Sequence, residues 1–475
     1  MINSLTILSV IIVLTANTKG NELNLCTKLT SAGADEIEAL PGLGEAPNFK
    51  HYSGYLKSAD KHLLHYWFVT SQNDPCQDPL VRFVKVFWFN GGPGCSSLGG
   101  LLEELGPYLV NPDGKTLRQN PHSWNKNASV VFIESPVGVG FSYSSDNEQV
   151  LSGDESTAQG NYEAVKQFFD KFPLFRTNRV FITGESYAGI YVPTLVAKIL
   201  DGQAKFPINL EGMAIGNGHL HTAMNYDTMA RFAYFHGLVG EETWKKLEND
   251  CCGGCIDTCD LGSLYGECRE RVLEIIEFCW NGGVNIYDIY RDCDHQPDSK
   301  RMKAIRNGIF KSAKGTQLNG TTDFRNLFDE NKNKQLREVS KVVTGIPCLD
   351  DKTVAKYLNS PNVRKVLNIP TNVPAWEECS HFVFDTFMRA YDDLSPFVLK
   401  AVDAKLRVLL YFGDTDMVCN FMQGQRFSAQ LGLATLAEKK PWYFGGQIAG
   451  FKTMYARGLT FLTIRGVGHM VRFLF

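Results

Sequence analysis

Short apolar runs rich in β-branched and aromatic residues recur along the chain, and longer segments with apolar residues at helical spacing lie between them. The runs predict buried strands at 80–89, 129–134, 180–183, 210–215, 406–412 and 459–464. The helical spacing predicts helices at 98–105, 158–172 and 354–367. Strands that alternate with helices and end in glycine-rich loops are typical of an α/β sheet with its ligand site at the strand ends.

Two aromatic-rich segments, 51–56 and 63–69, precede this alternating pattern. The polar residues 57–61 separate them, so the two segments predict a β-hairpin at an edge of the sheet. A mostly polar leader, 28–48, comes before the hairpin.

The pattern changes between residues 219 and 348. Apolar spacing there becomes helical and short, and cysteines crowd at positions 251, 252, 255, 259, 268, 279 and 293. The tract 300–341 holds eleven Lys/Arg against four Asp/Glu, which favours an exposed, cleavable loop over a polyanion-binding surface. We therefore predict a core in two parts, 21–218 and 349–475, with an inserted cap at 219–348.

Composition and the N-terminal segment indicate a protein of the secretory pathway. Its 475 residues are 44% hydrophobic and 21% charged, which suits a large globular core. A net charge of -3 argues against nucleic acid as a main partner, and thirteen cysteines fit an oxidising compartment. The apolar run 5–16 predicts a signal peptide within 1–20, and since no other run of 18 apolar residues follows, we expect no membrane association after its removal.

Two sequons, at Asn127 and Asn319, could carry glycans. Asn319 is the better candidate, because Asn127 lies at the mouth of a predicted strand.

The sequence GESYAG at 184–189 follows a predicted strand and opens a helix-compatible segment. Such a Gly-x-Ser-x-Gly turn forms a nucleophile elbow, in which a strained serine projects its hydroxyl from the end of a sheet. The motif alone is weak evidence, since a glycine-rich turn with a surface serine has the same pattern. Ser186 is the candidate nucleophile if the chain also supplies a base, an orienting acid and oxyanion donors.

Two further polar residues follow predicted strands in the order expected for a Ser–Asp–His triad on an α/β-hydrolase sheet. Asp416 follows the strand at 406–412, and His469 follows the strand at 459–464. His469 would accept the Ser186 proton, and Asp416 would fix the imidazole tautomer and stabilise the imidazolium. Asp414, two residues earlier, is the rival orienting acid.

Acyl transfer also needs hydrogen-bond donors where the oxyanion develops. Two backbone N–H groups are candidates: that of Tyr187, directly after the nucleophile, and that of Gly92. Gly92 lies in a glycine-rich loop at the end of a buried apolar strand, a position that favours a functional loop over a plain tight turn.

Five segments together resemble the serine carboxypeptidases. They are WFNGGPGCSS at 88–97, ESPVGVGFSY at 134–143, GESYAG at 184–189, GDTD at 413–416 and GHM at 468–470. Residues 184–191 and 447–451 are most similar to the lysosomal members, and the resemblance extends from about residue 34 to 469. It implies an α/β-hydrolase fold with a mixed, mostly parallel sheet and an inserted, disulfide-rich and mainly helical cap.

The resemblance implies an exopeptidase that releases one C-terminal, hydrophobic residue from peptides through an acyl-enzyme, without a cofactor or metal. It also assigns binding of the substrate's terminal carboxylate to Trp88, Asn90, Gly91, Glu104 and Glu185. Two adjacent carboxyl groups cannot both ionise cheaply, so one keeps a proton and can donate a hydrogen bond to a substrate carboxylate. We therefore expect activity at acid pH. Without the resemblance, Glu104 would be interpreted as a solvated helix residue.

The resemblance also implies disulfides. The expected pairs are Cys95–Cys379, Cys293–Cys348, Cys251–Cys268 and Cys252–Cys259, with Cys255 as the rival within the cap. Cys26 and Cys76 are additional to the family pattern and are candidates for pairing with each other, and we expect Cys419 to be a free, buried thiol beside Asp416.

One segment departs from the family. After His469 the chain reads Met470-Val-Arg-Phe-Leu-Phe475 and lacks a Pro-containing loop and final helix, so we expect a shortened end and weak anchoring of His469. Two other functions stay open: an acyltransferase with the same triad, and a non-catalytic stabilising partner of other lysosomal hydrolases. Expected partners are peptides with a free C-terminus, a second copy of the chain and other lysosomal hydrolases, in a lysosomal or secreted location.

Overall fold

The computed structural model describes residues 33–72, 84–281, 284–293 and 351–471. Several predictions concern other residues and lie outside this part of the chain: the signal peptide, Cys26, Cys76, the loop 300–341, Asn319 and Cys348.

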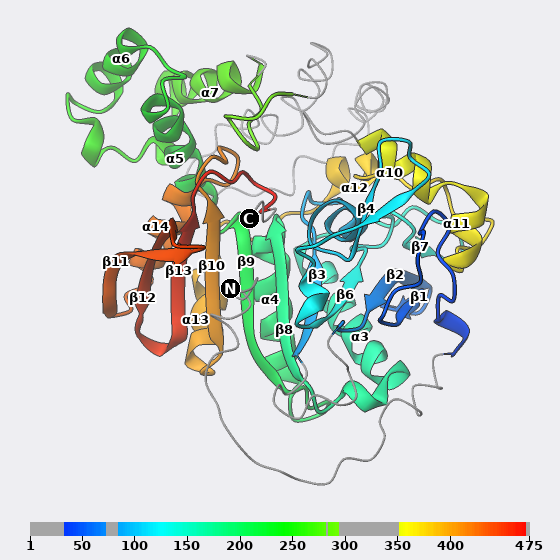
Figure 1. Cartoon of the computed structure of the whole chain (residues 1–475). Coiled ribbons are helices and arrows are strands. Elements are labelled where there is room, and N and C mark those ends of the chain that lie inside the picture. The colour runs from blue at the N-terminus through cyan, green and yellow to red at the C-terminus, as the bar shows by residue number, and fades with distance from the viewer. Residues whose placement is uncertain (1–32, 73–83, 282–283, 294–350, 472–475) are drawn as a thin grey trace.

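A single large sheet forms the centre of the molecule (Figure 1). Within the described residues it has eleven strands, and the spatial order is β1 (His51–Lys57), β2 (His62–Val69), β6 (Ser129–Ile133), β3 (Val84–Phe89), β8 (Arg179–Ser186), β9 (Leu210–Gly218), β10 (Arg407–Gly413), β13 (Leu459–Ile464), β12 (Gln447–Tyr455) and β11 (Thr435–Phe444), with β7 (Tyr143–Ser144) paired to β2. Strands β6 to β13 pair in parallel, and the outer strands at both edges are antiparallel. The fold is thus the mixed, mostly parallel sheet of an α/β-hydrolase.

The central strands are buried on both faces, which explains their continuous apolar sequences. All residues of β3 and β6 are buried. One face packs against α3 (Asp154–Lys171), α4 (Ala188–Gly202), α13 (Ser395–Asp403) and α14 (Phe421–Gln430). The other face packs against α2 (Ser97–Gly99), α10 (Asp351–Leu358) and α11 (Pro361–Val366).

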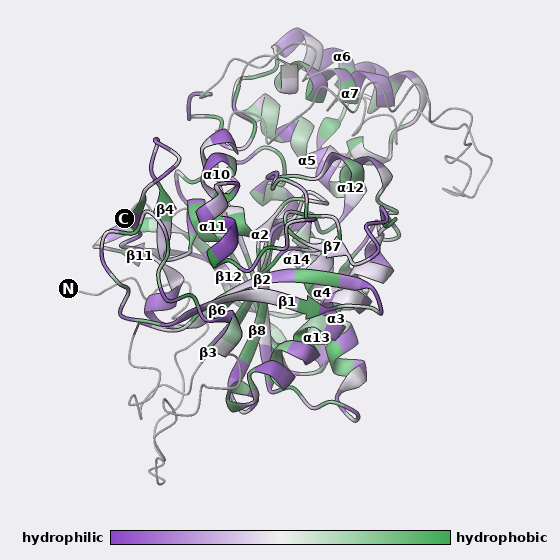
Figure 2. Ribbon diagram, turned by 90° about the vertical axis from the view of Figure 1, so that its right-hand side faces the viewer, coloured by the Kyte–Doolittle hydropathy of each residue, from purple (hydrophilic) through white to green (hydrophobic). Residues whose placement is uncertain are grey.

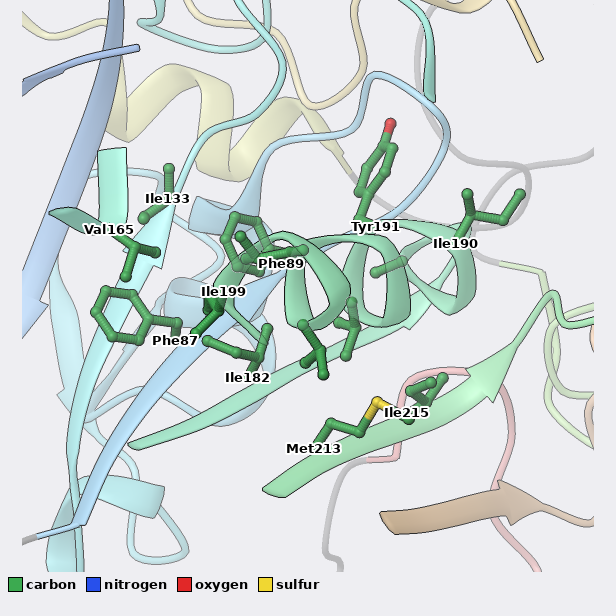
Figure 3. Close-up of a cluster of buried hydrophobic side chains, with 14 of the residues drawn as sticks. Phe87, Phe89, Ile133, Val165, Ile182, Ile190, Tyr191, Ile199, Met213 and Ile215 are labelled. Atoms are coloured by element: carbon green, nitrogen blue, oxygen red, sulfur yellow. The ribbon is translucent and has the colours of Figure 1, made fainter. Parts of the chain in front are cut away.

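Aromatic and aliphatic side chains join α3 and α4 to the sheet. Figure 3 shows Ile190, Tyr191 and Ile199 of α4 with side chains from β3, β8 and β9. On α3, the fully buried Phe168 ring lies 5.3 Å from Phe87 between ring centroids. Complete burial of one such side chain contributes about 1.5–3 kcal/mol, so these contacts fix the helices that surround the predicted nucleophile.

The predicted hairpin is present as β1 and β2, in register from the His51–Val69 pair to the Lys57–Leu63 pair, and it lies at one edge of the sheet. The hairpin at the opposite edge, β11 and β12, was not predicted. Its exposed residues include Glu438, Lys439 and Lys440, so an apolar pattern is lacking.

Two predicted helices are wrong as continuous elements. The segment 98–105 instead forms the single turn α2 followed by a π-helical turn, η2 (Gly100–Glu104), in which Leu105 N–H donates to the Gly100 carbonyl at 2.9 Å. The segment 354–367 is divided into α10 and α11. Proline at 361 begins α11 because its ring fits the first helical turn but not a helix interior.

Three helices, α5 (Thr222–Phe235), α6 (Glu241–Cys251) and α7 (Gly266–Asn281), form the cap around their own hydrophobic cluster. Figures 1 and 2 show them beyond the end of the sheet at which β9 leads into α5. Among the described residues, no helix has the length and apolar character to cross a bilayer.

The remaining short elements lie in the connections. They are β4 (Tyr108–Val110), β5 (Leu117–Gln119), η3 (Trp124–Lys126), η4 (Pro173–Phe175), η5 (Ile256–Thr258), η6 (Leu261–Ser263), α12 (His381–Thr386) and η9 (Ala456–Gly458).

Candidate active site

Ser186 ends β8 in a left-handed backbone conformation, with φ of 63°. This conformation is costly for a residue other than glycine and typical of a serine held on a strand-to-helix turn. The flanking glycines are required sterically. A Cβ on Gly184 would overlap the Phe89 carbonyl oxygen, and one on Gly189 would lie 2.5 Å from the carbonyl oxygen of His219. The local sequence therefore folds as a nucleophile elbow.

The predicted base and orienting acid are in contact. His469 Nδ1 lies 2.8 Å from Asp416 Oδ2, and both residues are buried. Since β8, β9, β10 and β13 are neighbours in that order, the loops after β10 and β13 meet at the same sheet end as Ser186. The rival, Asp414, does not take this position, because its Oδ1 accepts a hydrogen bond from Gly466 N–H at 2.6 Å.

Asn217 at the end of β9 is a residue of the site that the sequence analysis missed. Its Nδ2 donates to Asp416 Oδ2 at 2.9 Å, and its Oδ1 accepts from Gly413 N–H at 2.8 Å. The backbone N–H groups of Val418 and Cys419 also donate to Asp416, at 2.9 and 3.1 Å. The predicted strand ending in Gly-Asn-Gly at 216–218 was the only signal that could have indicated it.

A cap segment holds the loop of His469, which the sequence analysis also missed. His469 N–H donates to the Tyr287 carbonyl at 2.7 Å, and the two rings lie 5.0 Å apart between centroids. Asp288 Oδ1 accepts from the Thr415 hydroxyl at 2.8 Å. We expected weak anchoring of His469, but in the structure the cap fixes both its backbone and its ring.

The glycine-rich loop after β3 lies against the elbow. A Cβ on Gly91 would overlap Tyr187 N and lie 2.8 Å from Ser186 Cβ, so only glycine permits this approach. The next residue, Gly92, has φ of 110°, which also favours glycine. Tyr187 precedes α4, in whose first turn N–H groups lack intrahelical acceptors. The roles of the Gly92 and Tyr187 N–H groups as oxyanion donors stay a prediction.

Asn90 joins the residues predicted to bind a terminal carboxylate. Its Nδ2 donates to Glu185 Oε1 at 2.8 Å and lies 3.4 Å from Glu104 Oε1. Its Oδ1 accepts from Trp88 Nε1 at 2.7 Å. Gly100 makes room for this group, because a Cβ there would overlap Trp88 Nε1. The structure thus brings the carboxyl groups of Glu104 and Glu185 to the Asn90 amide, and Glu185 directly precedes Ser186 in the sequence.

Burial and nearby carboxylates raise the pKa values of two further groups. Burial, followed by the charges of Glu185 and Glu104, raises the pKa of the Tyr411 hydroxyl. Burial, followed by the charges of Asp416 and Glu185, raises the pKa of the Cys419 thiol. Cys419 is therefore a neutral, buried free thiol in the described structure, as the sequence analysis expected.

Three of the expected disulfides are present in the structure: Cys95–Cys379, Cys251–Cys268 and Cys252–Cys259. Cys293 is also disulfide-bonded, and its expected partner lies outside the described residues. The rival Cys255 is a free, exposed thiol.

Asn127 is half-buried at the end of η3. Within residues 33–72, 84–281, 284–293 and 351–471, no cluster of three or more His, Cys, Asp or Glu side chains could hold a metal ion.

The fold and the elbow define an α/β-hydrolase, and sequence comparison gives the family. The chain belongs to the serine carboxypeptidase family, whose model matches residues 41–474. It is 40% identical over 450 residues to the mouse (Mus musculus) lysosomal protective protein, covering 92% of this chain and 90% of the relative. A Caenorhabditis elegans serine carboxypeptidase is 38% identical over 453 residues, covering 93% and 91%. The resemblance found in the sequence is thus confirmed.

The fold also matches a solved structure. KEX1(delta)p, a prohormone-processing carboxypeptidase from Saccharomyces cerevisiae, superimposes with a TM-score of 0.69 and 22% identity, covering 93% of each chain. At this identity the match supports the fold alone.

Proposed function

We propose that this serine-type carboxypeptidase releases single hydrophobic C-terminal residues from peptides at acid pH, through an acyl-enzyme on Ser186. The observation that carries the proposal is the Asn90 amide, which gathers the carboxyl groups of Glu185 and Glu104 beside the elbow. An endopeptidase or a general esterase has no need of such a group, whereas an exopeptidase must recognise a terminal carboxylate.

In the proposed reaction, Ser186 Oγ attacks the last peptide carbonyl while His469 accepts its proton. Asp416 holds the imidazole through the 2.8 Å contact to Nδ1, and so stabilises the imidazolium. The N–H groups of Gly92 and Tyr187 bind the oxyanion. His469 then protonates the leaving amine, and a water molecule hydrolyses the acyl-enzyme by the same route.

Recognition of the terminal carboxylate depends on a proton shared by Glu104 and Glu185. Two carboxyl groups at one amide ionise together only at a large electrostatic cost, so one retains its proton at acid pH. That carboxyl group and Asn90 donate hydrogen bonds to the substrate. As pH rises the shared proton is lost, and repulsion between carboxylates weakens peptide binding.

Two further parts of the proposal concern the preferred leaving residue and the location of the protein. The preference for a hydrophobic leaving residue is supported by the family resemblance and by two aromatic side chains near the carboxyl groups, Trp88 beside Asn90 and Tyr411 near Glu185. A lysosomal or secreted location is supported by the disulfides and by the lysosomal relative. A homodimer and complexes with other lysosomal hydrolases stay predictions.

Two measurements test the proposal. A fluorophosphonate probe should label the wild-type protein and not Ser186→Ala. A peptide with a free C-terminus should lose its last residue at about pH 5, and its C-terminal amide should react poorly there. Equal rates for the free and amidated peptides would refute carboxylate recognition. Absence of labelling would favour the non-catalytic alternative, and transfer of the acyl group to an added alcohol without hydrolysis would favour the acyltransferase.

A further inference from the structure

An exposed arginine, Arg389, lies over the side chain that follows the nucleophile. Its guanidinium carbon is 5.3 Å from the centroid of the Tyr187 ring. Buried Asp154 fixes the loop that carries it by accepting hydrogen bonds from the N–H groups of Ala390 at 2.6 Å and Tyr391 at 3.3 Å. The same carboxylate accepts a hydrogen bond from the Tyr187 hydroxyl at 2.9 Å. The loop and the elbow are therefore attached to one anchor.

The two faces of the sheet separate the groups on either side of Ser186. Hydrogen bonds of the Asn90 side chain link Glu185 to Trp88, and Trp88 packs in the hydrophobic cluster of one face. Tyr187 packs in the cluster of the opposite face, beside Phe387 at 5.6 Å between ring centroids. With the carboxylate of the leaving residue on the Glu185 side, we take the acyl part of the peptide to leave Ser186 on the opposite side, where Tyr187 lies. Its first side chain, the penultimate residue of the substrate, then meets the Arg389 loop.

The charge of Arg389 influences several groups on this side. After burial, which is the larger effect, it lowers the pKa of His219, so this imidazole is neutral. It also opposes the rise that burial causes in the pKa of Asp154. Ion pairs between described residues do not include Arg389. Two acidic residues near Arg389 have other hydrogen-bond partners. Asp154 is buried and accepts the hydrogen bonds described above, and Asp393 accepts a hydrogen bond from Ser395 N–H at 2.8 Å. Asp392 of the same loop is exposed to solvent.

We propose that Arg389 is a specificity-determining residue that favours peptides with Asp or Glu as the penultimate residue. The inference rests on the proposed function, because that function sets the direction in which the acyl chain leaves Ser186. A carboxylate about 4 Å from an exposed guanidinium gains an attraction that corresponds to about a five-fold increase in kcat/KM. A lysine at the same substrate position is disfavoured by a similar factor.

The test uses three blocked dipeptides with a C-terminal phenylalanine and with Glu, Gln or Lys before it. The quantity measured is the ratio of kcat/KM values between substrates at about pH 6, where a free Glu side chain is ionised. Because Glu and Gln have the same shape, their ratio reports charge alone. It is also independent of the amount of active enzyme, which fluorophosphonate titration measures separately.

For the wild type we expect a Glu/Gln ratio of about five that shrinks as ionic strength rises from about 0.05 to about 0.5 M. Arg389→Met keeps an apolar stem over the ring and should bring the ratio to about one, and Arg389→Glu should favour the Lys substrate. Lys440→Met, which removes one exposed charge on β11, is the matched control and should keep the wild-type ratio.

Two results would overturn the inference and are distinguishable. If the wild type cleaves all three peptides with a ratio of one, or if the ratio persists in Arg389→Met, the role of Arg389 is refuted while the proposed function stands. If the wild type cleaves none of the peptides, the proposed function fails and the inference fails with it.

Discussion

Asn217 and Asp416, 199 residues apart in the chain, are joined by a 2.9 Å hydrogen bond from Nδ2 to Oδ2. The same Asp416 oxygen contacts His469 Nδ1. Asn217 has φ of 36° and is completely buried at the end of β9, next to the strand of the nucleophile. In the proposed mechanism Asp416 orients the base His469, so we predict that Asn217 acts as a positioning residue for Asp416.

Asn217→Ala should lower kcat by about 10- to 100-fold with a small change in KM, because Asp416 loses a donor that fixes it but the peptide-binding groups are untouched. Steady-state kinetics on one peptide would measure both constants. Asn209→Ala, which removes an exposed amide whose Nδ2 donates to the Thr177 carbonyl at 3.2 Å, is the control and should behave as wild type. A rise in KM at constant kcat would contradict the positioning role.

Glu104→Gln should flatten the pH dependence of KM between about pH 5 and pH 7. In the wild type, loss of the proposed shared proton should raise KM by up to about ten-fold per pH unit, whereas a glutamine amide donates at every pH. KM measured across this range for a free peptide provides the test. Glu103→Gln, on the same π-helical turn, is the matched control and should keep the wild-type profile. An unchanged profile in Glu104→Gln would show that the pH dependence has another origin.

Lys85→Met should have a larger free energy of unfolding than the wild type, and the difference should grow as pH falls. Lys85 is fully buried without a hydrogen-bond partner among the described residues, between the rings of Phe68 and Phe175. Burial holds its pKa well below the usual value, so the unfolded chain binds a proton that the folded chain does not. Wild-type stability thus increases with pH, by about 1.4 kcal/mol per pH unit between the folded-state pKa and the ordinary lysine value.

Denaturant unfolding of wild type and Lys85→Met at several pH values from about 6 to about 9 would measure this difference. The gap between the two proteins should narrow steadily toward high pH. A gap that does not vary with pH would mean that Lys85 keeps its proton in the folded state, held by the aromatic rings.

Asp227→Asn should destabilise the junction between the cap and the core by about 3–5 kcal/mol. Asp227 of α5 is buried and contacts two arginines: Arg231 of the same helix at 3.1 Å, and Arg426 of α14 in the core. Removal of its charge leaves buried Arg231 without a carboxylate. The expected result is a lower unfolding midpoint, measured by thermal or denaturant unfolding. Asp250→Asn breaks the exposed pair with Arg271 and should cost under about 1 kcal/mol. Equal effects of the two substitutions would contradict a structural role of Asp227.

Most of the sheet could be predicted because its strands are buried on both faces and have continuous apolar sequences. The strands that end at Ser186 and before Asp416 and His469 belong to this class. Strands β11 and β12 could not be predicted, because many of their residues are exposed to solvent at the edge of the sheet and they therefore lack a continuous apolar sequence. The π-helical turn before Leu105 could not be predicted either, since the close approach of Gly100 to Trp88 is a tertiary contact that the spacing of apolar residues in 98–105 does not encode.

The sequence by itself determined the elbow, the order of the candidate nucleophile, acid and base, and the glycine-rich loop, because each is a local pattern at the end of one strand. Only the tertiary structure showed that Asp416 and not Asp414 contacts His469, placed Asn217 against Asp416 and Tyr287 against His469, and brought Arg389 over Tyr187. The physical reason is that these contacts join segments up to about two hundred residues apart, whose meeting depends on strand order and on the packing of the cap. The local conformational propensity of a segment does not determine strand order or the packing of the cap.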